Sequence, residues 1–417
     1  LITSSLLGAV NFIVTIIQLR APGMTWFRMP FFVWAQFVTA FLLLLAFPPL
    51  EAAGIMQLMD RVCDTSFFLP TGVFDSGATS MAVSGGGSPL LWQHLFWFLG
   101  HPEVYVLILP AIGIVTEVVA NNTRRPVWGY KFMVGSLLVL GFLSFIVWAH
   151  HMYLTGMSAK VATFFQTTTM IISIPSVILL TCLFMTLWKG SIRFNTPSMF
   201  ALAFLPMFGI GGLTGLPLGF NFTDLHLHDS YYVIAHFHYV VAPGTIFGLF
   251  AGVYYWFPKM TGRRMNEYWG KVHFWGSLIF MNIIFMPMFL QGFAGLGRRM
   301  SDGGATYSLL QNPDLTSGGL SDFIIGLNGY ISLGAFGMFL IQLVFVINFF
   351  YSIRNGEKVD SDNPWQSTTV EWQTPTPPPH GNFPKQPVVY GDPYEYSVPG
   401  AAKDFIPQTQ KKRPQGV

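Results

Sequence analysis

Two histidines two positions apart, His236 and His238, lie in an apolar stretch that runs from about residue 231 to residue 256. Ionisable side chains at membrane depth are costly and need partners, so they are candidates for function. Positions i and i+2 of a helix point about 200° apart, so the two imidazoles face opposite sides of one helix. Such a helix could hold two different cofactors. The simpler alternative is a pair of core histidines bonded to neighbouring carbonyls.

A second apolar stretch begins with the segment His101-Pro-Glu103-Val-Tyr105 close to its start. His101 and Tyr105 are four residues apart, so on a helix they share one face. Glu103 points elsewhere. An imidazole and a phenol are therefore expected on one face of this helix.

A third apolar stretch ends in Trp148-Ala-His150-His151, where two adjacent histidines taken alone favour a solvated helix end. Counted at ~1.5 Å per residue, however, His101, His150, His151 and His236 all fall in the same outer third of a bilayer. Imidazole suits copper, zinc and iron, and a single histidine commonly holds haem iron. The pattern predicts a copper on three of these histidines facing a haem held by the fourth, with His238 free to ligate a second haem.

The composition identifies the elements that must position these residues. Hydrophobic residues make up 52% of the chain and charged residues 10%, which excludes an ordinary soluble domain. Runs long enough to cross a bilayer begin near Phe31, Leu95, Phe132, Thr163, Ser198, Tyr231, Val272 and Gly326. A shorter run over residues 6–19 comes first. Because a bilayer admits only helices or closed barrels and no strand-like alternation is present, we expect an all-α, polytopic transmembrane bundle of about nine spans.

The basic residues alternate along the chain, because every second loop is rich in them. They are Arg20 and Arg28, then Arg124, Arg125 and Lys131, then Lys189 and Arg193, then Lys259, Arg263, Arg264 and Lys271, and finally Arg354 and Lys358. By the positive-inside rule, these loops are cytoplasmic. We expect residues 1–351 to form the membrane bundle, beginning within a helix whose start is absent. Residues 352–417 are expected to be a Pro-rich cytoplasmic tail, extended rather than folded alone.

Three polar groups have two interpretations each. His228 and Asp229 could bind a hard cation or cap a helix. Arg298 and Arg299 could pair with carboxylates such as haem propionates, or be ordinary surface arginines. A stripe of Thr169, Ser173 and Ser176 could line water, or its hydroxyls could bond to carbonyls of their own helix.

Four motifs occur together: HPEVY, WAHHM, LHDSYYVIAHFHYV and the Arg298-Arg299 pair. With them the chain resembles subunit I of the haem-copper terminal oxidases from about Ser4 to Phe383, in the A-type branch that contains mitochondrial and common bacterial cytochrome c oxidases. The resemblance implies reduction of dioxygen to water coupled to proton pumping, in the cytoplasmic membrane of a bacterium.

The resemblance also implies roles for individual residues. His101, His150 and His151 would hold copper, His101 would be covalently joined to the catalytic Tyr105, His236 would ligate the high-spin haem and His238 the low-spin haem. Arg298 and Arg299 would bind the propionates, His228 and Asp229 a magnesium ion, and Glu103 would gate a proton pathway lined at its upper end by Ser4, Ser5 and Asn11.

The implied cofactors are two haems of the a type, one copper and magnesium. The implied partners are a subunit III, a subunit II with any dinuclear copper site, and cytochrome c or another electron donor, with no nucleic acid. The two cysteines, Cys63 and Cys182, are not expected to meet, so this chain offers no cysteine pair for such a copper site.

Two positions depart from the family pattern. The chain has no histidine in an early helix to serve as the second low-spin haem ligand, so we expect the first helices to be missing or to lie in another chain. Leu179 stands where relatives commonly have a lysine of a second proton pathway. Thr169, Ser173 and Ser176 are our hypothesis for a substitute.

Two alternatives remain. A nitric oxide reductase-like relative would share the histidines, but Tyr105 argues against it. A non-redox membrane proton transporter would not need the pair His236 and His238 or the two arginines.

Overall fold

The computed structural model describes residues 2–70, 72–75, 80–83, 85–303 and 320–411. In these residues, eight helices are long and apolar enough to cross a membrane, and the shorter apolar helix Ile2–Gln18 precedes them. This agrees with the predicted helical bundle. In chain order the elements are α1 (Ile2–Gln18), η1 (Trp26–Arg28), α2 (Phe31–Val62), β1 (Gly72–Asp75), β2 (Ser80–Val83), α3 (Pro89–Thr123), α4 (Tyr130–Leu143), η2 (Ser144–Ile146), η3 (Trp148–Met152), α5 (Ala159–Leu187), α6 (Thr196–Gly219), α7 (Asn221–Leu227), α8 (Tyr231–Val240), η4 (Val241–Ile246), α9 (Phe247–Thr261), α10 (Glu267–Phe293), α12 (Leu320–Asn355) and η5 (Val370–Gln373).

Local sequence signals set several helix boundaries. The side chains of Asn195, Ser230 and Asn266 each accept a hydrogen bond from a backbone N–H in the first turn of α6, α8 and α10, which satisfies donors that the helix itself leaves free. Gly262, at φ +71°, ends α9 in the left-handed conformation that glycine adopts at low cost.

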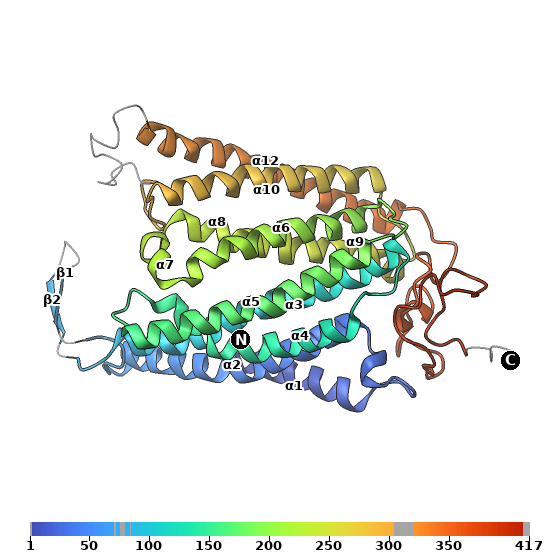
Figure 1. Cartoon of the computed structure of the whole chain (residues 1–417), viewed down its shortest axis with the longest axis horizontal. Coiled ribbons are helices and arrows are strands. Elements are labelled where there is room, and N and C mark those ends of the chain that lie inside the picture. Colours follow the sequence, from blue (N-terminus) through green and yellow to red (C-terminus); the bar gives the residue numbers. More distant parts are fainter. Residues whose placement is uncertain (1, 71, 76–79, 84, 304–319, 412–417) are drawn as a thin grey trace.

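The loops separate into two groups at the two ends of the bundle (Figure 1). The basic loops and the C-terminal segment lie at one end, which we name the inner end after the predicted orientation, and α7 with the β1–β2 hairpin lies at the other, named the outer end. Helices α10 and α12 pack together at one edge, and α1 and α2 at the opposite edge. Helix α3 lies between them and packs against α2, α9 and η3. Because α3 carries His101 and packs against η3, which carries His150 and His151, it positions all three histidines.

Two of the spans are irregular where the predicted ligands occur. The span that begins with α4 changes to the 3₁₀ turns η2 and η3 before its outer end, and His150 and His151 lie in η3. The span Tyr231–Thr261 contains the π-helical segment η4 directly after α8, and Pro243 lies within it. A π segment is a common feature of functional sites.

The C-terminal segment, residues 356–411, is irregular apart from η5, but it packs against the bundle. Trp372, Tyr394 and Tyr396 are almost fully buried and belong to the same core cluster as α2, α3 and α9. The predicted boundary at residue 351 therefore falls inside α12, and no separate core begins after it.

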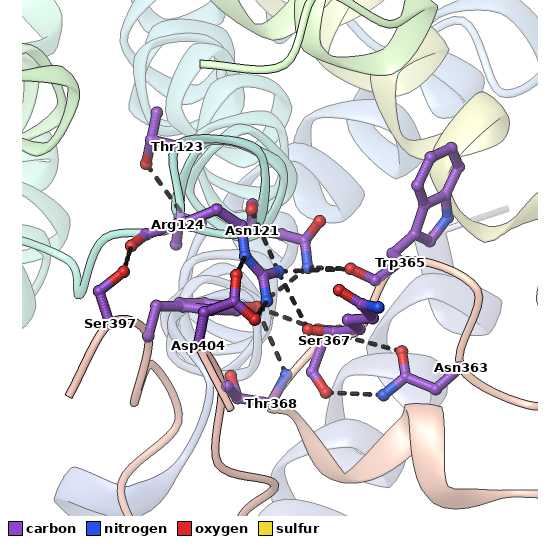
Figure 2. Close-up of polar contacts among 12 residues, drawn as sticks. Asn121, Thr123, Arg124, Asn363, Trp365, Ser367, Thr368, Ser397 and Asp404 are labelled. Atoms are coloured by element: carbon purple, nitrogen blue, oxygen red, sulfur yellow. Dashed lines mark hydrogen bonds and ion pairs between the residues drawn. The ribbon is translucent and has the colours of Figure 1, made fainter. Parts of the chain in front are cut away.

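Figure 2 shows how the C-terminal segment is held at the end of α3. The buried Arg124 donates from Nε and Nη2 to the two carboxylate oxygens of Asp404, at 2.8 and 2.9 Å, and from Nη1 to the Gln366 carbonyl at 3.1 Å. Ser397 Oγ donates to the Arg124 carbonyl at 2.8 Å. Arg124 itself has φ +55° and ends α3.

Candidate metal centre

Three imidazoles converge at the outer end of the bundle. Nδ1 of His101 lies 3.1 Å from Nε2 of His150 and 3.5 Å from Nε2 of His151, and the last two atoms are 3.0 Å apart. The centre of a triangle with these sides is about 1.9 Å from each corner, close to the ~2.0 Å of a metal–imidazole bond. The predicted three-histidine cluster is therefore present, with dimensions that fit one metal ion.

A hydrogen bond sets the tautomer of His150. Its Nδ1 lies 2.9 Å from Thr169 Oγ1, whose own proton is donated to the Phe165 carbonyl at 2.6 Å. Because the hydroxyl proton is already used, Thr169 accepts from Nδ1–H of His150. Nε2 of His150 then presents its lone pair to the centre of the triangle, as a metal ligand must.

His101 and His151 are fixed by aromatic neighbours. The His151 ring is stacked on Trp97, with ring centroids 3.9 Å apart and planes within 9°. His101 is 6% exposed and its Nε2 is buried without a hydrogen-bond partner among the described residues. The Tyr105 ring is its neighbour on that helix face, with centroids 5.0 Å apart. The covalent join between them remains a prediction, and the free Nε2 is compatible with it.

His236 lies against α6. Its Nδ1 donates to the Gly211 carbonyl at 2.9 Å, so Nε2 is left with a free lone pair. A Cβ added at Gly215 would come within 2.8 Å of His236 Cε1. The small residues of α6 therefore make the space in which this ring stands, and the ring fits a haem iron ligand.

His238 faces a different helix from His236. Its Nδ1 donates to the Ile234 carbonyl at 2.8 Å, and its ring is stacked on Phe285 of α10 at a centroid distance of 4.2 Å. The i, i+2 spacing predicted this divergence. Because the proton is on Nδ1, Nε2 of His238 has a free lone pair and can ligate a different metal from His236.

The predicted magnesium and propionate residues contact one another at the same end. His228 Nδ1 is 2.9 Å from Asp224 Oδ2, and this hydrogen-bonded carboxylate raises the pKa of His228. Asp229 Oδ1 accepts from Arg298 Nε at 2.7 Å and Nη2 at 2.6 Å. Arg299 is exposed. The carboxylate that Arg298 binds here is thus Asp229, and magnesium and propionate binding remain predictions.

Several residues predicted for proton transfer lie at the surface of this chain. Glu103, Ser4 and Asn11 are exposed in this chain. Asn11 Oδ1 accepts a bond from Thr15 at 3.3 Å.

In α5 the hydroxyls of Thr169, Ser173 and Ser176 all donate to carbonyls three or four residues earlier, which is the second of the two interpretations considered for them. Of the three hydroxyls, that of Thr169 also contacts a predicted copper ligand, His150. The side chain of Leu179 is buried. A pathway through this stripe remains a prediction.

Several site residues were not singled out from the sequence. Trp97 is four residues before His101, so the helical spacing could have placed it beside the cluster. Gly211 and Gly215 have the small-xxx-small spacing that lets membrane helices approach closely, which could have indicated contact with another helix. Phe285 carried no such signal.

Comparisons with known proteins show the family of the chain. Residues 1–321 match the model of the family "Cytochrome C and Quinol oxidase polypeptide I". The chain is 46% identical over 406 residues to the alternative cytochrome c oxidase subunit 1 of Bradyrhizobium diazoefficiens, which covers 97% of this chain and 66% of that protein.

It is 42% identical to cytochrome c oxidase subunit 1 of Synechocystis sp. (95% of this chain, 66% of the relative). It is 41% identical to that of Bacillus sp. strain PS3 (93% of this chain, 58% of the relative). The chain thus spans two thirds or less of the length of these relatives.

A cryo-EM structure of a heme-copper terminal oxidase dimer has the same fold, with a TM-score of 0.63 at 20% identity, over 80% of this chain and 58% of that one.

Proposed function

Because this chain belongs to the cytochrome c and quinol oxidase polypeptide I family, we propose that it forms the catalytic core of a terminal oxidase that reduces dioxygen to water and couples this to proton pumping. The observation that supports the proposal most directly is the triangle of His101, His150 and His151 nitrogens. Its sides of 3.0 to 3.5 Å suit one copper ion.

Within this proposal His236 and His238 hold two haems of the a type through Nε2, one on each side of the same span. The copper and haem iron, when bound, supply redox-active metals for the reduction of dioxygen. The protein keeps the ligand nitrogens unprotonated by engaging Nδ1 of His150, His236 and His238 in hydrogen bonds to an oxygen atom.

Tyr105 and Glu103 have separate proton roles in the proposed reaction. The Tyr105 ring lies beside His101, with ring centroids 5.0 Å apart, and its hydroxyl carries a proton that it can release at the metal centre. The Glu103 carboxyl is on another side of α3, where it can take up protons brought along Ser4, Ser5 and Asn11. We further propose that His228 and Asp229 bind magnesium and that Arg298 and Arg299 hold haem propionates.

The proposed setting is the cytoplasmic membrane of a bacterium, with the C-terminal segment on the cytoplasmic side. The gathering of the basic loops at the same end as this segment supports that orientation. The proposed partners are a subunit II with any dinuclear copper site, a subunit III, and cytochrome c or another electron donor.

A reduced-minus-oxidised absorption spectrum of the purified complex, with and without carbon monoxide, tests the proposal. We expect two haem signals, of which only one responds to carbon monoxide, together with dioxygen consumption. Absence of haem bands would exclude the oxidase function and favour the alternative of a non-redox membrane proton transporter. Haem bands with turnover of nitric oxide but not of dioxygen would assign the chain to the nitric oxide reductase-like branch.

A further inference from the structure

One face of α3 carries two pairs of residues at different depths. His94, Phe98, His101 and Tyr105 follow one another at intervals of four, three and four residues, so they form a single stripe. The lower pair, His101 and Tyr105, lies at the metal centre. The upper pair, His94 and Phe98, contacts the segment that brings the other two copper ligands.

That segment is η3, and Trp148 is its first residue. The indole Nε1–H of Trp148 donates to His94 Nδ1 at 3.3 Å. The indole ring also packs edge to face against Phe98, at a centroid distance of 5.4 Å, and against Phe165 of α5, at 5.1 Å. Trp148 is therefore held between α3 and α5, two residues before His150.

The anchor matters because η3 is a short 3₁₀ turn. It follows Val147, which has φ −120° and ψ −5° and interrupts the helix. Hydrogen bonds in 3₁₀ turns have poorer geometry than those of α-helices, so the backbone of η3 alone fixes the His150 and His151 rings weakly. The hydrogen bond from the Trp148 side chain to His94 holds this turn against α3, the helix that also carries His101.

We propose that His94 is a positioning residue for the copper ligands, through the hydrogen bond that its Nδ1 accepts from Trp148. This inference rests on the proposed copper site. The indole N–H can only donate, so His94 must present an unprotonated Nδ1 and carry its proton on Nε2. An asparagine at position 94 would offer Oδ1 at the same number of bonds from the backbone.

The test compares copper retention in the purified complex carrying His94→Leu, His94→Asn or Trp148→Phe. We expect His94→Leu to lose about 10-fold in copper affinity during dialysis against a chelator, as for other residues that orient metal ligands. His94→Asn should remain within about 2-fold of the unaltered complex. The infrared C–O stretch of carbon monoxide on the reduced copper should broaden in His94→Leu and stay narrow in His94→Asn.

A double variant and a control separate the hydrogen bond from general damage. Trp148→Phe removes the donor, and the His94→Leu/Trp148→Phe double variant should lose no more copper than the worse single variant, because both remove one bond. His226→Leu is the control: this exposed histidine of α7 also packs against an aromatic ring, that of Phe222, and its change should leave copper retention unaltered.

Three results would overturn the inference. They are equal copper retention in His94→Leu and the unaltered complex, equal losses in His94→Leu and His94→Asn, and fully additive losses in the double variant. If His94→Leu does not assemble, the contrast between His94→Asn and Trp148→Phe decides in the same way. An unaltered complex without copper would instead contradict the proposed function.

Discussion

The two ends of α3 each gather polar groups from distant parts of the chain, but in opposite ways. At the outer end the nitrogens of His101, His150 and His151 face one another at 3.0 to 3.5 Å. At the inner end the Arg124 guanidinium faces the Asp404 carboxylate and the Gln366 carbonyl at 2.8 to 3.1 Å. Like groups meet at one end and complementary groups at the other.

The difference separates a ligand site from a structural contact. Three imidazole lone pairs cannot satisfy one another, whereas a metal cation can accept all three. The Arg124 guanidinium needs no further group, because Nε and Nη2 donate to the oppositely charged Asp404 carboxylate and Nη1 donates to the Trp365 and Gln366 carbonyls. Polar groups that meet as donors and acceptors form a structural contact and do not indicate a ligand. Several acceptors that meet without a donor, as the three imidazole nitrogens do, indicate a bound cation.

The largest effect is expected when one of the three imidazoles that converge at the outer end is removed. His151→Ala should reduce copper content and dioxygen reduction by at least about 100-fold, since removal of a ligand costs more than removal of a group that orients it. The measurements are metal content and dioxygen uptake per haem. The signal of the haem on His238 should persist, and copper bound at full occupancy in this variant would contradict the site.

The next effect concerns the space beside His236. Gly215→Ala should lower the content of the haem that responds to carbon monoxide several-fold, because its Cβ would lie 2.8 Å from His236 Cε1. Gly212→Ala is the matched control on the same helix, since a Cβ there meets nothing within 4 Å. Equal haem contents in the two variants would show that His236 does not depend on this space.

At the inner end the expected effect is on stability and not on chemistry. Asp404→Asn leaves the buried Arg124 charge without its partner and should destabilise the protein by about 1–3 kcal/mol, less than for a fully buried pair because Asp404 is half-exposed. Thermal denaturation measures this, with activity per haem unchanged at low temperature.

Asp392→Asn is the control for that change. Its ion pair with Arg28 is 3.9 Å long and its side chain is 73% exposed, so the expected cost is below about 0.5 kcal/mol. A stability loss as large as that of Asp404→Asn would remove the distinction between buried and exposed pairs.

The smallest effect is the pH dependence of the inner contact. The hydrogen bond from Arg124 lowers the pKa of Asp404 below its ordinary value of 3.8. A carboxyl whose pKa is lowered on folding stabilises the protein above its unfolded pKa, and this contribution is lost as the pH falls through the folded value. The stability difference between the unaltered protein and Asp404→Asn should therefore be constant from pH 5 to 8 and shrink below about 3.8. A difference that shrank near pH 6 would implicate another group.

Much of the outer site could be predicted because depth in a membrane follows from position in a sequence. The rise per residue predicted one common depth for four histidines, His101, His150, His151 and His236. The i, i+2 spacing predicted that His236 and His238 contact different helices. The inner contact could not be found in this way. Tyr394, Tyr396 and Trp372 lie in a stretch without helical periodicity, and the surface that buries them consists of the ends of helices far apart in the chain.

The sequence by itself determined the helical bundle, the depth of the histidines and the chemistry that they can support, because apolar length and helical spacing are local properties. The tertiary structure decided which nitrogen of each imidazole faces its neighbours. It also decided that Asp229 forms an ion pair with Arg298 and that the C-terminal segment packs into the core. These outcomes depend on which surfaces meet, and surfaces meet through packing and hydrogen bonds between residues that no local pattern connects.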